Sequence, residues 1–107
     1  MDYQTLTVTI TDRIGQVTLD RPDVRNAFNE QSIAELALAF DELGRNELVR
    51  AIVLAANGPA FCAGADLRWM KKMAGYSDSE NRADAMRLAD MLRTIYRCPK
   101  PVLAKVQ

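Results

Sequence analysis

The chain has 107 residues, enough for a single domain, and its 14 basic and 14 acidic side chains give a formal net charge of zero. This balance does not favour a nucleic-acid-binding protein or one that binds acidic membrane surfaces. Histidine is absent, which excludes Ser-His-Asp triads, Cys-His dyads and histidine-based zinc sites within the chain.

The sequence also indicates a compartment. Its apolar runs are far too short to span a bilayer, and Met1–Gln4 lacks the charged and apolar regions of a signal peptide. The two cysteines, Cys62 and Cys98, do not form a C-x-x-C motif. We therefore expect a reduced, cytoplasmic protein with no membrane partner and no metal site.

The first residues predict a β-hairpin. Apolar residues alternate with threonine over Leu6–Ile10, which is typical of a half-buried strand. Thr11–Arg13 has the composition of a turn, and Ile14–Leu19 alternates again. Two strands joined this tightly are expected to pair antiparallel.

A helix and a third strand follow. Apolar residues recur at helical spacing over Glu30–Leu43, with Asn29 as the expected N-cap and Gly44 as the expected C-terminal cap. Arg50–Ala55 then predicts a buried strand. The order strand, helix, strand predicts a crossover connection and a parallel pairing between the second and third strands.

The stretch after this strand combines turn formers with small residues. Asn57-Gly58-Pro59 ends the strand, Ala63-Gly64-Ala65 carries little side-chain bulk, and a helix is expected from Ala65 to about Met73. Gly64 can adopt a positive φ, and free N–H groups at a helix start can bind an anion. The same pattern also fits an ordinary loop with Asp66 as a helix cap.

The remaining residues predict one more helix and the beginning of a strand. Ser77 and Glu80 have the spacing of a capping box, and a helical stripe runs to about Arg97. Cys98–Pro101 ends this helix, and a fourth strand is expected near Val102. Since the sequence stops inside that strand, we expect residues 1–107 to be the N-terminal part of a longer domain.

Five stretches, in order, resemble one family. F-C-A-G-A-D-L, beginning at Phe61, resembles the F-x-A-G-A-D-L/I signature of the enoyl-CoA hydratase/isomerase family, also called the crotonase family. The other four stretches are Val17–Pro22, Arg25–Phe28, Ala51–Leu54 and Pro99–Ala104. The resemblance implies an α/β fold, the N-terminal portion of a crotonase-like ββα spiral. This portion would hold the hairpin, the crossover helix, the parallel strands and two further helices.

The resemblance also implies a site for an acyl-coenzyme A thioester. In the family, two backbone N–H groups hold the thioester oxygen, and Ala63 is the position that we match to the first donor. The resemblance further implies that substrate is contacted by Arg25, Gly64, Ala65, Asp66 and Leu67. No separate cofactor is expected, because coenzyme A is part of the substrate. The second donor and the two catalytic glutamates of the family would lie beyond Gln107.

Several side chains near this stretch allow two interpretations. Arg25 could line the coenzyme A groove or be a solvated surface charge. The basic residues Arg68, Lys71 and Lys72 could meet phosphates or form a solvated helix face. Trp69 and the neighbouring methionines could line an acyl pocket or pack in the core.

Among the family reactions, the resemblance favours the lyase that hydrates trans-2-enoyl-CoA, and the finer expectation is a methylglutaconyl-CoA hydratase type. Such enzymes act in fatty acid metabolism and in branched-chain amino acid degradation. An isomerase, another family enzyme, and a non-catalytic coenzyme A-binding or assembly module remain alternatives. The full-length protein is expected to form trimers or hexamers, and the isolated 107 residues are expected to be inactive.

Overall fold

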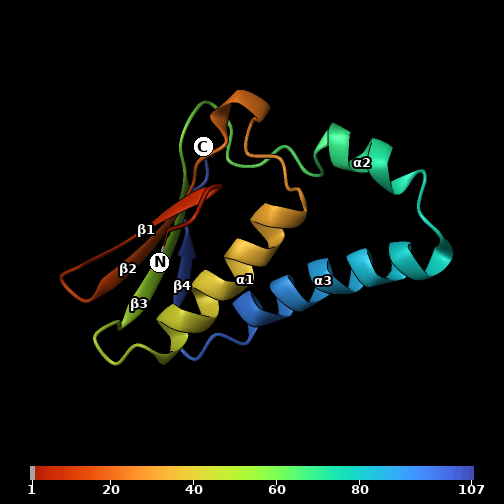
Figure 1. Cartoon of the computed structure of the whole chain (residues 1–107). Coiled ribbons are helices and arrows are strands. Elements are labelled where there is room, and N and C mark those ends of the chain that lie inside the picture. Colours follow the sequence, from red (N-terminus) through yellow and green to blue (C-terminus); the bar gives the residue numbers. More distant parts are fainter. Residues whose placement is uncertain (1) are drawn as a thin grey trace.

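A computed structural model describes residues 2–107 as a mixed β-sheet with helices on one side (Figure 1). Helix α1 crosses one face of the sheet, and α3 lies against α1. Helix α2 and the loop before it lie at the opposite end of α3 from β4. The elements are β1 (Leu6–Thr11), β2 (Ile14–Leu19), a short 3-10 helix η1 (Pro22–Val24), α1 (Glu30–Arg45), β3 (Ala51–Ala56), α2 (Leu67–Met73), α3 (Asp78–Tyr96) and β4 (Val102–Ala104).

The sheet has the strand order β1-β2-β3-β4. Strands β1 and β2 pair antiparallel, whereas β3 pairs parallel with both β2 and β4. Asp12 and Arg13 connect β1 to β2 with φ angles of 50° and 67°, as a tight type I′ hairpin turn requires. The predicted hairpin, the parallel pairing of β2 with β3, and the strand near Val102 are therefore confirmed, as is the predicted fold class.

The core lies between the sheet and α1. Leu36 and Phe40 of α1 are almost fully buried, as are Val17 of β2 and Ile52 of β3. Asn29 caps α1 as predicted: its side chain accepts from the Ser32 N–H, and Ser32 Oγ accepts from the Asn29 N–H. The apolar periodicity of the sequence therefore reports the buried face of α1 correctly.

The prediction that Gly44 caps α1 is wrong. Gly44 lies inside the helix, which continues to Arg45 and ends at Asn46 in an extended conformation. Lys100 Nζ donates to the carbonyls of Leu43 and Asn46, so the helix end is satisfied without a left-handed residue. Gly44 instead allows a close approach, since an added Cβ would lie 3.3 Å from Pro99 Cδ.

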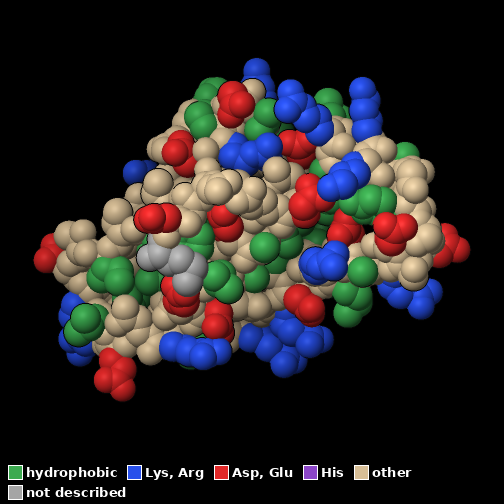
Figure 2. All heavy atoms as spheres, in the orientation of Figure 1, with side chains coloured by type: hydrophobic (Ala, Val, Ile, Leu, Met, Phe, Trp, Pro, Cys, Tyr) green, Lys and Arg blue, Asp and Glu red, His purple; other side chains and the backbone are tan. Residues whose placement is uncertain are grey.

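Helix α3 is more exposed than its apolar stripe suggests. Met91 is fully buried against the core, but Leu92 and Tyr96 are exposed. Ser77 and Glu80 form the predicted capping box at its start. No helix within residues 2–107 is long and apolar enough to cross a membrane. Figure 2 shows acidic and basic side chains interspersed over one face of the molecule, consistent with the zero net charge.

Candidate functional site

Residues 57–66 connect β3 to α2, and we call them the β3–α2 loop. Asn26 joins this loop to the chain segment that follows β2. This residue is 3% exposed and has a φ of 57°, a left-handed conformation that asparagine tolerates better than most residues. Its side-chain oxygen accepts from the Arg21 N–H at 2.7 Å. Its side-chain nitrogen donates to the carbonyls of Asn57 and Ala60 at 2.8 and 2.9 Å. One amide therefore fixes both segments, a role that the motif match did not reveal.

A parallel β-bridge between Phe28 and Ala65 sets the orientation of the end of this loop. The Phe28 N–H donates to the Gly64 carbonyl, and the Asp66 N–H donates to the Phe28 carbonyl, both at 2.7 Å. Because the peptide groups of an extended segment alternate in direction, the N–H of Ala65 itself is turned away from Phe28. Within residues 2–107 this N–H has no hydrogen-bond acceptor, and Ala65 is exposed.

The N–H of Ala63, which the sequence indicated as the oxyanion donor, is already engaged. It donates to the Arg25 carbonyl at 3.0 Å. The left-handed conformations of Arg25 and Asn26 turn that carbonyl toward the loop. A second acceptor would have to displace this bond, so the N–H of Ala63 is less available to a ligand than that of Ala65.

Gly64 adopts a φ of 99°, as the sequence predicted that it could. An added Cβ there would meet no heavy atom within 4 Å, so the requirement for glycine is set by the backbone conformation and not by space. Gly58 differs, because its φ is 93° and an added Cβ would lie only 2.8 Å from Pro22 Cβ. The two glycines therefore allow the loop to turn at Gly64 and to pack tightly at Gly58.

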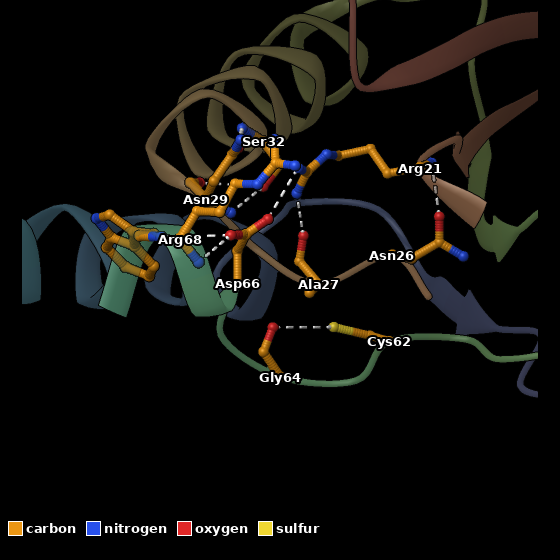
Figure 3. A network of polar contacts seen from close by, with 10 residues as sticks. Arg21, Asn26, Ala27, Asn29, Ser32, Cys62, Gly64, Asp66 and Arg68 are labelled. Atoms are coloured by element: carbon orange, nitrogen blue, oxygen red, sulfur yellow. Dashed lines mark hydrogen bonds and ion pairs between the residues drawn. The ribbon is translucent and has the colours of Figure 1, made fainter. Parts of the chain in front are cut away.

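Asp66 is held by the start of α2 and by an arginine distant in the sequence (Figure 3). One carboxylate oxygen accepts from the N–H groups of Arg68 and Trp69, and the other pairs with Arg21 Nη2 at 2.9 Å. The hydrogen bond from Arg21 lowers the pKa of Asp66, and the backbone donors of Trp69 and Arg68 add to the effect. Arg21 also donates to the Ala27 carbonyl.

The contacts of Asp66 determine what the start of α2 can bind. The N–H groups of Arg68 and Trp69 are occupied by the cap, so the expectation that free N–H groups at this helix start bind an anion does not hold for them. Asp66 is an ionised structural carboxylate and is not placed to act as a base. Arg21 belongs to the motif that begins at Val17, but no local signal in the sequence indicated that it pairs with Asp66.

A pocket of about 570 Å³ lies beside the loop, and we call it the loop groove. All but one of the sequence-predicted site residues line it; the exception is Gly64. Leu67 is 74% exposed, and neither Arg25 nor Arg68 forms an ion pair within the described part of the chain. The groove is lined by Arg21, Asp23, Val24, Arg25, Ala27, Ala63, Ala65, Asp66, Leu67 and Arg68.

The structure distinguishes between the two interpretations for three side chains of α2. Trp69 is only 5% exposed and belongs to the core cluster, so the packing interpretation holds for it. Lys72 pairs with Glu30 at 3.3 Å on the surface. Arg68 lies on the groove, where it can donate to a bound anion.

Comparison with known proteins gives a consistent result. The family model described as enoyl-CoA hydratase/isomerase matches residues 9–107. A Rhodobacter capsulatus protein named "probable enoyl-CoA hydratase" is 40% identical over an alignment of 108 positions, which covers 99% of this chain and 39% of that protein.

Two solved structures of proteins named as enoyl-CoA hydratases are similar to this chain. The crystal structure of an enoyl-CoA hydratase from Shewanella pealeana has a TM-score of 0.95 and 39% identity, covering 97% of this chain and 39% of that one. The enoyl-CoA hydratase from Mycobacterium smegmatis has a TM-score of 0.88 and 40% identity, covering 96% and 40%. The chain thus spans about two fifths of the length of these relatives.

The Arg21–Asp66 pair predicts an acid-sensitive contribution to stability. Unfolding returns the lowered pKa of Asp66 to about 3.9, so the stabilisation is present above that value and is lost as pH falls through the folded pKa. We expect the free energy of unfolding in urea, measured from about pH 6 to about pH 2.5, to fall less steeply for Asp66→Asn than for wild type.

Asp23→Asn is the matched control, because Asp23 is exposed and makes no ion pair within residues 2–107. Its curve should run parallel to that of wild type. Parallel curves for Asp66→Asn and wild type would contradict the role of the pair.

Proposed function

The chain belongs to the enoyl-CoA hydratase/isomerase family, and from this membership we propose that it binds a coenzyme A thioester and supplies one oxyanion donor for the hydration of a trans-2-enoyl-CoA. The observation that carries the proposal is the N–H of the exposed residue Ala65. It is held by the Phe28 bridge, has no acceptor within residues 2–107, and belongs to a residue of the loop groove.

The chemistry requires a donor of this kind. When water adds to an enoyl thioester, its oxygen bonds to C3, a proton goes to C2, and between these events negative charge resides on the thioester oxygen. A preorganised N–H aimed at that oxygen stabilises the charge more than it stabilises the neutral substrate, and one such donor lowers the barrier by about 3–4 kcal/mol. We assign this role to Ala65 in place of Ala63, whose N–H is bonded to Arg25.

The rest of the loop groove suits the remainder of a coenzyme A thioester. Arg25 and Arg68 supply exposed guanidinium groups, which bind phosphate through paired hydrogen bonds. Ala63 and Gly64 present no bulky side chain, so a narrow pantetheine chain can approach the backbone closely. Leu67 provides an exposed apolar surface for it.

Asp66 is occupied by Arg21 and its own helix cap, and the family resemblance implies that the carboxylates that activate water lie beyond Gln107. We therefore propose that the 107 residues alone bind a thioester but do not hydrate it. For the whole protein we propose a homo-oligomer. The segment F-C-A-G-A-D-L-R-W-M-K-K-M supports, as the finer proposal, a methylglutaconyl-CoA type of substrate.

We expect the chain to bind butyryl-CoA, a saturated thioester that cannot be hydrated. Trp69 is the sole tryptophan and directly follows groove residue Arg68, so its fluorescence should report binding. Arg68→Gln should weaken binding by about tenfold, the range for one charge-assisted contact, while Arg50→Gln, an exposed arginine at the opposite end of β3, should not. Equal losses in both variants, or rapid hydration of crotonyl-CoA by the pure chain, would refute the proposal.

The donor itself is tested in a chimera in which this chain replaces the matching 39% of the Rhodobacter capsulatus relative. Proline has no N–H, so Ala65→Pro should lower kcat for crotonyl-CoA by about 10²- to 10³-fold. Ala63→Pro is the matched control: it breaks the bond to Arg25 and should raise KM more than it lowers kcat. Circular dichroism confirms that both variants are folded. A large kcat loss confined to Ala63→Pro would return the assignment to Ala63.

A further inference from the structure

Helix α2, which carries two residues of the loop groove, is anchored to α3 by a single buried polar bond. The indole Nε1–H of Trp69 donates to Asp84 Oδ2 at 3.1 Å, and both residues are buried. From this geometry we infer that Asp84 is a positioning residue: through Trp69 it holds α2 in the place where Leu67 and Arg68 can contact the thioester. The inference rests on the proposed function of the groove.

The other attachments of α2 are few. Met73 is partly buried and packs against the core, and the remaining polar contacts are weak or lie at the N-cap residue Asp66. Trp69 is the buried residue of this seven-residue helix. The pair between Lys72 and Glu30 is exposed at both partners, and pairs of this kind contribute little. The Arg21–Asp66 pair fixes only the point where α2 begins. Without the bond to Asp84, only the apolar packing of Trp69 and Met73 would hold α2 beyond its N-cap, and we expect its groove residues to shift.

Asp84 is well placed for this task. It lies in the second turn of α3, so its backbone is fixed by the helix. Its second carboxylate oxygen, Oδ1, accepts from Arg87 Nη1 at 2.6 Å. The charge of the buried carboxylate is thereby compensated by Arg87 while Oδ2 remains directed at the indole. An ionised acceptor makes a stronger hydrogen bond than a neutral one, which suits a bond that fixes Trp69, the buried residue of this short helix.

The bond can be tested apart from thioester binding. In the ¹⁵N-labelled chain, the sole indole N–H resonance reports the bond, and the amide resonances of residues 65–68 report the position of α2. Trp69→Phe, which keeps an aromatic ring but has no indole N–H, should shift the amides of residues 65–68. Asp84→Leu should shift the same amides and the indole resonance. Arg87→Gln is the control, because it leaves the indole bond in place, and it should shift neither.

Binding of butyryl-CoA is then measured by calorimetry on the same variants. We expect Trp69→Phe and Asp84→Leu each to weaken butyryl-CoA binding by about fivefold or more. The double variant Trp69→Phe/Asp84→Leu should bind no more weakly than either single variant. Asp84→Asn, which keeps an oxygen acceptor, should retain most of the affinity. If Asp84→Leu does not fold, the butyryl-CoA affinities of Trp69→Phe and of the double variant Trp69→Phe/Asp84→Asn decide whether Asp84 positions α2.

Unchanged amides of residues 65–68 in Trp69→Phe, or normal affinity in every folded variant, would overturn the role of Asp84. So would an affinity loss in Arg87→Gln as large as in Trp69→Phe. If wild type binds no butyryl-CoA, the proposed function fails, whereas the amide shifts still decide whether Asp84 positions α2.

Discussion

The site depends on the two short backbone hydrogen bonds that join Phe28 to Gly64 and Asp66. They pair a segment that follows β2 with one that follows β3, so the parallel register of these strands is continued beyond the sheet. Because a bridge uses alternate peptide groups, it engages the residues on either side of Ala65 and turns the Ala65 N–H away from Phe28, with no acceptor among residues 2–107. Gly64 can take part only because it adopts a positive φ. Asn26 completes the arrangement by holding the beginning of the same loop.

The sequence predicted the parts of the structure that depend on local pattern. Alternation defined β1 and β2, helical spacing and Asn29 defined α1, and the small residues around Gly64 located the loop. It did not predict which N–H is free, because that depends on a bond between Ala63 and Arg25 that forms only in the folded chain. The cap at Gly44 failed for a similar reason, since Lys100, far along the chain, satisfies the helix end.

The molecule divides into a rigid part and a lightly held part. The sheet and α1 share a closely packed core, to which α2 contributes only the buried Trp69 and the partly buried Met73. Binding regions are often drawn from the less stable parts of a fold, and the loop groove lies at this boundary. Arg21 and Asp84 connect the two parts, one at the beginning of α2 and the other through Trp69. The groove is thus shaped by polar contacts between segments that are distant in the sequence.

The central claim is that the Ala65 N–H, and not that of Ala63, receives the thioester oxygen. It is tested most directly by titrating the ¹⁵N-labelled chain with butyryl-CoA and, separately, with free coenzyme A, which lacks the thioester carbonyl. We expect a downfield shift of the Ala65 amide proton with butyryl-CoA only, while the Ala63 amide, already bonded to Arg25, responds equally to both ligands. A thioester-specific shift at Ala63 with none at Ala65 would contradict it.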